Sequence, residues 1–281
     1  MAALYAVLLK LKADGDAIVS PTQGHHAYGL FLALIRRSSP SMADELHASD
    51  SMKPFTISPL QGKFQRATKN LKIIGGYEYS IRLTFLKEDV FAYFMDATLK
   101  AVSQPLRLEA AIFHIDHIIL HHDDSPFCRH QSYQELFTES QPVRKISLQF
   151  LSPTAFRSGG KRNVLFPEAS LTFGSYLSKW QHFSPIKVNK HTAEVLEQII
   201  VARYKLNTHI LHFNAYQETG FEGECTFELP VDFDEGSLKT INTLADFAFY
   251  CGTGAKTTMG MGQTRRTTRE LGQQKPPHLN N

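Results

Sequence analysis

The sequence contains few of the features that mark disulfide-bonded, membrane-spanning or disordered proteins. Its 281 residues include only three cysteines, which lie far apart at Cys128, Cys225 and Cys251. An odd number of scattered cysteines argues against a disulfide framework and a cysteine-based zinc site, and favours a reducing compartment. No run of about 18 apolar residues occurs, which excludes a helical membrane span. With 42% hydrophobic and 20% charged residues, the chain can bury a core.

The net charge is small, but the charges are unevenly distributed. Thirty Lys and Arg residues against 27 Asp and Glu residues give a formal charge of +3, which identifies no partner. Three windows, residues 51–77, 141–163 and 247–269, contain several cations and no acidic residue. Each window alone is typical of a solvated face, but three together favour a polyanion that contacts the protein at several places. Phosphates are the obvious polyanion, and such contacts weaken as salt rises.

Hydrophobic periodicity predicts two halves with a similar order of elements. The first half contains expected strands at 3–12, 78–87 and 106–121 and helices at 25–38, 41–48 (N-capped by Ser41) and 88–103. After residue 141 the pattern restarts, with strands at 144–151, 207–213, 220–229 and 257–266 and helices at 167–182, 189–204 and 235–249. The apolar start of the chain has neither a basic segment nor a small-residue cleavage site, so we expect a strand there and not a signal peptide.

This order of elements predicts an α+β protein made of two tandem ferredoxin-like (RRM-like) βαββαβ domains with antiparallel sheets. We expect an N-terminal domain over residues 1–140 and a C-terminal domain over residues 141–268 that contains a glycine-rich segment. The polar residues 269–281 are expected to form a flexible tail.

The glycine-rich segment lies between the last predicted helix and the last predicted strand, and contains Gly252, Gly254, Lys256, Gly260 and Gly262. Glycine allows positive φ and close backbone approach, and the N–H groups of such a loop can bind phosphate oxygens. The segment is not a P-loop or a dinucleotide fingerprint, because no Gly-Lys-Ser/Thr closes it and a strand follows instead of a helix. We interpret it in two ways at once: some glycines permit tight packing, and the loop also approaches phosphates.

Four ordered segments carry a family resemblance. Besides the glycine-rich segment, they are KPFTISPLQG at 53–62, FLSPTAFRSGGK at 150–161 and GFEGECTFEL at 220–229. With these segments the chain resembles the repeat-associated RNA-binding superfamily of CRISPR systems, and more narrowly the CRISPR-associated endoribonuclease that cuts repeat RNA (Cas six). The resemblance spans nearly the whole chain.

The resemblance implies an endoribonuclease that uses neither a metal nor a cofactor. The 2′-hydroxyl of the RNA would attack the adjacent phosphate and leave a 2′,3′-cyclic phosphate and a 5′-hydroxyl. The implied partner is a CRISPR repeat RNA, often a hairpin, whose cleavage gives mature guide RNA for antiviral defence. A cytoplasmic prokaryotic protein is further implied, one that joins other CRISPR-associated subunits in an interference complex and does not contact a membrane.

Attack by a 2′-hydroxyl requires a group that transfers a proton and a cation that stabilises the charge on the phosphate. Histidine suits the first role because its pKa lies near neutrality, and lysine suits the second. By the resemblance, His47 and Lys53 match the family's histidine and lysine just before the Pro-Phe-Thr stretch. Leu32 occupies the position of a further family tyrosine and cannot serve. Tyr28, one turn earlier on the same helical face, is the expected substitute.

For RNA binding we expect recognition of shape and phosphates by the C-terminal domain. The expected contacts are the glycine-rich segment and Arg144, Lys145, Arg157, Lys161 and Arg162. His25 and His26 are expected to be phosphate contacts or plain surface residues.

Two other functions remain open at the level of sequence. A non-catalytic RNA-binding subunit would use the same basic windows but lack a working base. A metal-dependent phosphodiesterase would draw on the histidine-rich segment 113–124. On a strand, however, His114 and Asp116 share one face and His117 and His121 the other, so the segment by itself offers no convergent set of ligands.

Overall fold

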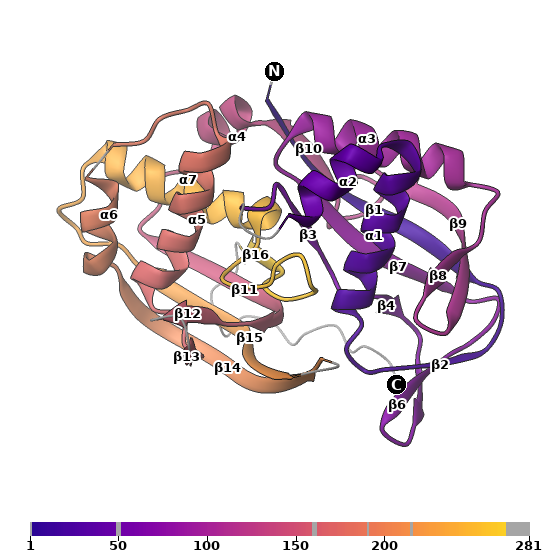
Figure 1. Ribbon diagram of the computed structural model, residues 1–281. Coiled ribbons are helices and arrows are strands. Elements are labelled where there is room, and N and C mark those ends of the chain that lie inside the picture. Colours follow the sequence, from indigo (N-terminus) through magenta and orange to yellow (C-terminus); the bar gives the residue numbers. More distant parts are fainter. Residues whose placement is uncertain (1, 49–51, 159–161, 190, 214–215, 268–281) are drawn as a thin grey trace.

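The structure, a computed structural model, describes residues 2–48, 52–158, 162–189, 191–213 and 216–267. Two α+β units lie side by side, with the first unit in indigo to magenta and the second in orange to yellow in Figure 1. The helices are α1 (Gly24–Ser38), α2 (Pro40–His47), α3 (Glu88–Ala101), α4 (Tyr133–Glu139), α5 (Ala169–Phe183), α6 (Thr192–Val195), a 3-10 turn η1 (Leu196–Gln198) and α7 (Glu235–Cys251). None of these helices has the length and apolar character needed to cross a membrane.

The strands of the first unit are β1 (Ala3–Ala13), β2 (Ala17–Val19), β3 (Phe55–Ile57), β4 (Gln61–Gly62), β5 (Gln65–Ala67), β6 (Asn70–Ile73), β7 (Glu78–Phe85), β8 (Leu106–Leu108), β9 (Ala111–Ile119) and β10 (Arg129–Ser132). The second unit contains β11 (Lys145–Thr154), β12 (Phe156–Ser158), β13 (Arg162–Val164), β14 (Ile200–His212), β15 (Gln217–Glu228) and β16 (Thr264–Thr267).

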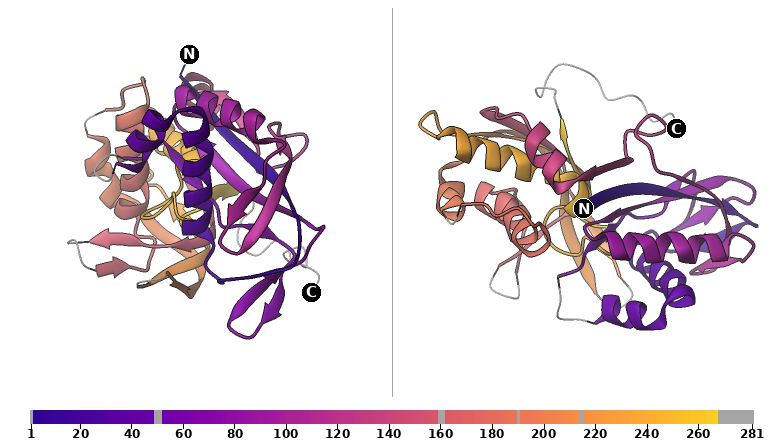
Figure 2. Two further views of the ribbon diagram at one scale, coloured as in Figure 1. Left: turned by 45° about the vertical axis from the view of Figure 1, so that its right-hand side comes forward. Right: turned by 90° about the horizontal axis from the view of Figure 1, so that it is seen from above.

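The first unit is ferredoxin-like. Its main sheet has the order β3-β7-β1-β9-β8, with antiparallel pairings throughout, and β4 and β10 add to β7 and β1. Strand β1 lies in the centre because its residues are apolar and buried on both faces. Helices α1 and α3 pack together over one face of this sheet, as the view from above in Figure 2 shows. The small sheet β2-β6-β5 projects from one end.

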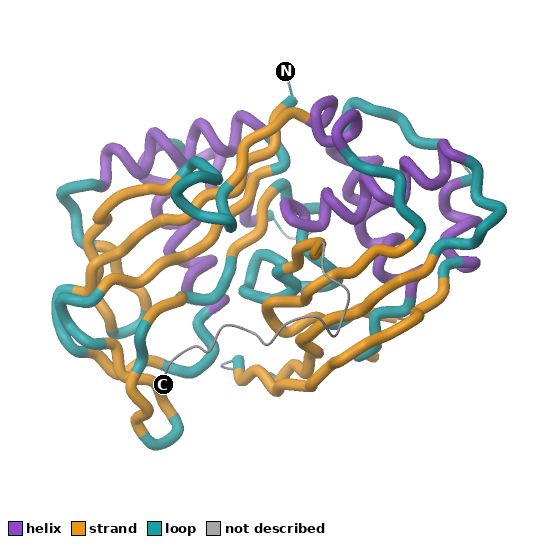
Figure 3. The backbone as a smooth tube through the Cα atoms, turned by 180° about the vertical axis from the view of Figure 1, so that it is seen from behind, coloured by secondary structure: helices purple, strands orange, loops and turns teal. Residues whose placement is uncertain are grey.

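The second unit repeats this topology. Its sheet has the order β14-β15-β11-β16, again antiparallel. The four main strands are β1, β3, β7 and β9 in the first unit and β11, β14, β15 and β16 in the second. Numbered along the chain, they lie in the order second, third, first, fourth in both sheets. Helices α5 and α7 pack against each other, and Trp180 of α5 meets Phe247 of α7 with ring centroids 5.2 Å apart. Figure 3 gives the view from behind, in which the strands of the first unit face the viewer. The predicted fold class is confirmed.

Four predicted elements differ from the structure. The strand expected at 106–121 is a hairpin of β8 and β9, which turns at Glu109, whose φ is +56°. Residues 189–204 do not form one helix: α6 and η1 end at Gln198, and Ile200 begins β14, because pairing with β15 along its whole length outweighs the local helical spacing. Helix α2 is capped by Ser39, whose side chain accepts from the Met42 N–H, and not by Ser41, because Pro40 already occupies the first helical turn. The last strand begins at Thr264 and not at residue 257.

The two units share apolar and polar contacts. Leu4 of β1 and Tyr133 of α4 belong to the hydrophobic core of the second unit, although both precede the expected boundary at residue 140. Between the units, the buried side chain of Arg82 on β7 donates to Gln263 Oε1 (2.8 Å) and to the carbonyl oxygens of Phe249 (2.8 Å) and Phe127 (3.0 Å). These contacts hold the glycine-rich segment against the first unit. The expected tail, 269–281, lies outside the described residues.

Candidate active site

Three side chains predicted from the sequence converge at the junction of α1, α2 and β3. His47 is the last residue of α2 and is exposed. Tyr28 lies on α1, and its hydroxyl oxygen is 3.4 Å from Nδ1 of His47. Lys53, half-buried just before β3, donates from Nζ to the carbonyl oxygen of Ala48, the residue that follows His47. A phenol therefore lies beside the imidazole, and an ammonium group is held at the backbone of the residue that follows the histidine.

The surroundings of Tyr28 keep its hydroxyl protonated. Its ring is half-buried and lies nearly parallel to the buried ring of Phe55, with centroids 6.3 Å apart. Burial raises the pKa of Tyr28 above its ordinary value of 10.0. At neutral pH this hydroxyl is therefore a hydrogen-bond partner of His47 and not a base.

The glycine-rich segment contacts α1, which carries Tyr28, and β3, which follows Lys53. Gly260 donates its N–H to the carbonyl of Ile57 on β3, and the N–H of Ile57 donates to the carbonyl of Thr257. Gly260 also lies against Gly24, the first residue of α1. A Cβ added to Gly24 would lie 1.9 Å from the Met259 carbonyl oxygen. Figure 1 shows this segment as the yellow loop between the two units. The second unit thus closes directly against the start of α1.

Most N–H groups of the glycine-rich segment are already bonded within the protein. Those of residues 252–255 and 259–262 donate to protein oxygens, for example Gly254 to Ser175 Oγ and Gly262 to the Pro153 carbonyl. The tight-packing interpretation therefore explains these glycines, since such contacts need backbones that approach closely. Phosphate contact by the segment stays a prediction.

Replacing Gly254 by alanine is expected to destabilise the protein by about 1–3 kcal/mol or more. Its φ is +71°, and an added Cβ would lie 2.3 Å from the Ala155 carbonyl oxygen. Gly29→Ala is the matched control, because Gly29 lies on the exposed side of α1 with nothing within 4 Å of the added Cβ. That change is expected to stabilise by up to about 1 kcal/mol. Urea denaturation of both variants measures the two effects, and equal midpoints would contradict this prediction.

The predicted basic contacts lie at two separate ends of β11. Arg144 and Lys145 precede or begin this strand, and the Arg144 guanidinium donates to the Pro230 carbonyl. Arg157 lies on β12 beyond the other end, with 56% of its side chain exposed. Arg162 begins β13, the partner strand of β12. Lys161 lies outside the described residues.

His25 and His26 are not part of the tyrosine–histidine–lysine cluster. Their rings are 3.8 Å apart at the start of α1, and Phe213 from the second unit lies 5.4 Å from His25. His26 Nε2 is 3.5 Å from a carboxylate oxygen of Glu109. Burial, together with His26, lowers the pKa of His25. These contacts place both histidines at the junction of the units, and neither of the two expectations for them is tested.

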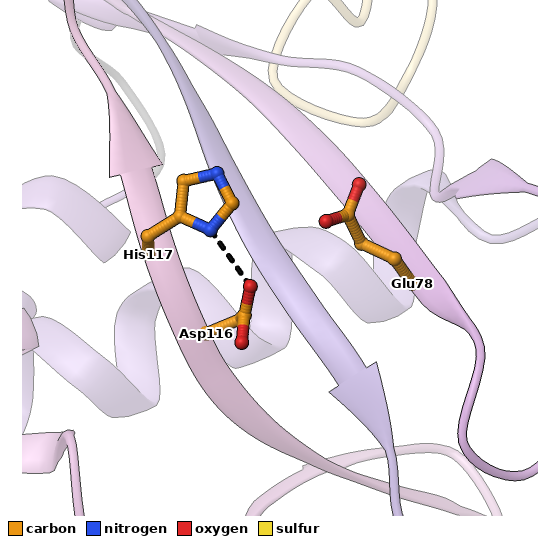
Figure 4. Close-up of side chains that lie close together, drawn as sticks. All are labelled: Glu78, Asp116 and His117. Atoms are coloured by element: carbon orange, nitrogen blue, oxygen red, sulfur yellow. Dashed lines mark hydrogen bonds and ion pairs between the residues drawn. The ribbon is translucent and has the colours of Figure 1, made fainter.

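The histidine-rich segment does bring two possible metal ligands together. Asp116 is an extra residue in β9, because the pairing with β1 shifts between Lys10 and Leu11, and this bulge places Asp116 beside His117. The expected separation of these two residues onto opposite strand faces is therefore wrong. Figure 4 shows them with Glu78, all three exposed. However, the Lys10 ammonium contacts the Glu78 carboxylate at 2.6 Å and supplies a charge partner without any metal. His114 instead faces Asp14 at 3.8 Å.

Two groups of functional interest were not found from the sequence. Arg129 lies with Lys145 and Arg266 around a pocket of about 570 Å³ between the units. Glu218 of β15 lies between Arg157 and Lys256 in a groove of about 660 Å³. An isolated Arg or Glu carries no local pattern, and its partners come from distant segments, so no sequence signal could have indicated either group.

The fold and the cluster define a class of protein: two ferredoxin-like units whose glycine-rich segment closes against a tyrosine–histidine–lysine site. Comparison with known proteins identifies the family. The sequence profile described as CRISPR-associated endoribonuclease Cas6 matches residues 148–264, and that of the CRISPR Cas6 N-terminal domain matches residues 4–138. The chain belongs to the Cas6 family.

Individual relatives agree with this assignment. A CRISPR-associated endoribonuclease Cas6 from Streptococcus thermophilus is 29% identical over 132 residues, which cover 46% of this chain and 53% of the relative, so the match spans about half of that protein. A Cas6 product complex is 30% identical with a TM-score of 0.80, covering 95% of this chain and 100% of that one. Thermus thermophilus Cas6 is 29% identical with a TM-score of 0.72, covering 95% and 99%.

Proposed function

We propose that the protein is the endoribonuclease that cleaves CRISPR repeat RNA by attack of a 2′-hydroxyl on the adjacent phosphate, giving a 2′,3′-cyclic phosphate and mature guide RNA. The observation that carries the proposal is the contact between Tyr28 and His47, with the Lys53 ammonium bound to the carbonyl of the residue after His47, in a member of the Cas6 family. A proton-transfer group next to a cation is the minimum that this reaction requires.

His47 would transfer the proton through Nε2. Nδ1 lies against the Tyr28 hydroxyl. In the tautomer whose Nδ1 carries the proton, Nδ1–H would donate to the Tyr28 oxygen, and Nε2 would accept a proton when the ring is neutral and donate one when it is protonated. The same ring orientation therefore serves a base that activates the 2′-hydroxyl or an acid that protonates the leaving 5′-oxygen. Hydrogen bonds of this kind are commonly long without substrate and shorten in the complex, which fits the 3.4 Å separation.

Lys53 would stabilise the negative charge that builds up on the phosphate oxygens. Its ammonium lies beside the end of α2, held by the Ala48 carbonyl. A phosphate bound against His47 would therefore lie within reach of an ammonium that is already positioned, so little reorganisation is needed when charge develops.

The repeat RNA would be bound mainly by the second unit. Arg157 and Arg162 lie on the β12–β13 hairpin, which projects beside β14 and β15 (Figure 1). Arg144 and Lys145, at the other end of β11, would form a second and separate contact with the RNA. Such contacts fix the position of a hairpin stem, while the scissile ribose would lie at the junction of the two units.

The test is cleavage of the repeat RNA from the neighbouring CRISPR array in excess EDTA. We expect a single cut, unchanged by EDTA, with a product that carries a 2′,3′-cyclic phosphate. A substrate with a 2′-deoxyribose at the cut site is the control, and it should bind but not be cleaved. Cleavage of the deoxy substrate, or activity that EDTA abolishes, would overturn the mechanism; tight binding of the unmodified RNA without any cleavage would indicate a non-catalytic RNA-binding subunit.

A further inference from the structure

Glu218 of β15 joins three segments that are far apart in the sequence. Its carboxylate accepts from Lys256 Nζ of the glycine-rich segment at 2.7 Å and from the side-chain amide of Asn163 on β13. The Arg157 guanidinium on β12 lies 3.5 Å from the same carboxylate. Only 12% of the Glu218 side chain is exposed. One nearly buried anion therefore ties the β12–β13 hairpin to the glycine-rich segment.

The Lys256 side chain is fixed by this contact. Besides Glu218, its ammonium donates to the Tyr216 hydroxyl at 2.7 Å and lies 3.9 Å from the centre of the Tyr216 ring. Only 13% of the side chain is exposed, and the backbone φ of Lys256 is +54°, a conformation that non-glycine residues adopt rarely. The positive φ and the enclosed ammonium together indicate that Lys256 anchors the turn.

The charges of this group do not cancel. Two cations face one carboxylate, so a net positive charge remains on the groove side, where Arg157 is 56% exposed. Burial raises the pKa of Glu218. The hydrogen bonds from Lys256 and Asn163 lower the pKa by more than burial raises it, so it lies below its ordinary value. The carboxylate is therefore charged at neutral pH and holds its donors as a charged partner.

We propose that Glu218 is a positioning residue for RNA binding: it pre-organises the β12–β13 hairpin and the glycine-rich segment so that Arg157 and its neighbours meet the RNA phosphates in a fixed geometry. The inference rests on the proposed function. It adds a residue whose negative charge would repel a phosphate, so Glu218 would act through its neighbours and not by touching the RNA. Pre-organisation raises affinity because the hairpin then loses less conformational freedom when RNA binds.

The sign of the charge effect makes this inference testable. If Glu218 acted only through its charge, Glu218→Gln would remove a repulsive anion, tighten RNA binding and steepen its salt dependence. If Glu218 positions the hairpin, the same change frees Arg157 and Lys256 from their anchor and weakens binding despite the more positive surface. The two roles therefore predict opposite results.

The experiment measures binding of the 2′-deoxy repeat RNA to the full chain across a salt titration. We expect Glu218→Gln to weaken binding by about 10-fold, the scale at which loss of a charged hydrogen-bond partner acts. In single-turnover cleavage of the unmodified RNA, the rate at saturating protein should stay within about twofold of wild type, since His47 and Lys53 are untouched, and the protein concentration for half-maximal rate should rise about 10-fold.

Glu222→Gln is the matched control. Glu222 lies four residues further along β15 and contacts His209 on β14 instead of the hairpin. The substitution removes the same charge as Glu218→Gln. The variant should bind RNA as tightly as wild type or more tightly. Unchanged or tighter binding by Glu218→Gln would overturn the inference while the wild type still binds and cleaves. Failure of the wild type to bind the repeat RNA would instead overturn the proposed function. Thermal melting of both variants should match wild type within a few degrees.

Discussion

His47→Ala is expected to slow cleavage of the repeat RNA by about 10²–10⁴-fold, the usual effect of removing a general acid–base group. Affinity for the uncleaved RNA should stay within about twofold, because the exposed imidazole at the end of α2 supports no core packing. The loss should therefore appear in the single-turnover rate at saturating protein and not in the concentration for half-maximal rate. Denaturant stability should not change.

His191→Ala is the matched control for this change. His191 is another exposed histidine, with 74% of its side chain accessible, and its ring contacts Glu194 in the second unit. Its removal should leave both rate and affinity at the wild-type level. Normal cleavage by the His47 variant would show that the proton is transferred elsewhere, and His25 and His26 would then be the next positions to change.

Arg82→Met is expected to destabilise the protein by roughly 3–5 kcal/mol. The buried guanidinium donates to Phe127, Phe249 and Gln263, and methionine fills similar space without any donor. One buried oxygen, that of Gln263, and two partly buried carbonyl oxygens would lose this donor at the junction between the units. Burial lowers the pKa of Arg82 to about 10, so the side chain is still a cation at neutral pH and its donors are all in place.

Urea denaturation measures this effect as a lower midpoint. Arg107→Met is the control, since Arg107 is the exposed residue of β8 and its guanidinium donates to the nearby Glu109 carbonyl; it should change stability by less than about 0.5 kcal/mol. A loss below 1 kcal/mol for the Arg82 variant would mean that the junction tolerates unpaired carbonyls. The prediction would then be refuted.

The residues of the candidate active site were predicted from the family resemblance and not from local patterns alone. His47 and Lys53 are six residues apart and match the family's histidine and lysine, and Tyr28 lies one helical turn before Leu32, the position of the family tyrosine. The substitution of Tyr28 for the family tyrosine at Leu32 is consistent with the contact to His47 at 3.4 Å, although its role in the reaction is a proposal.

Contacts between distant segments were not predictable. The helix expected at 189–204 gave way to β14 because β15 supplies a partner along the whole strand, which no local pattern reveals. Asp116 and His117 share a side only because of a bulge opposite Lys10 and Leu11. Glu218 meets its donors only after the hairpin, β15 and the glycine-rich segment have packed together.

By itself, the sequence determined the two βαββαβ units, because hydrophobic periodicity acts over a few residues, and it carried the family motif that indicated the catalytic candidates. Only the tertiary structure decided how the units close on each other, which glycines pack tightly, and which cations are held by a carboxylate. Those outcomes depend on buried polar groups finding partners across long separations in the chain, and such pairings are set by the packing of whole sheets.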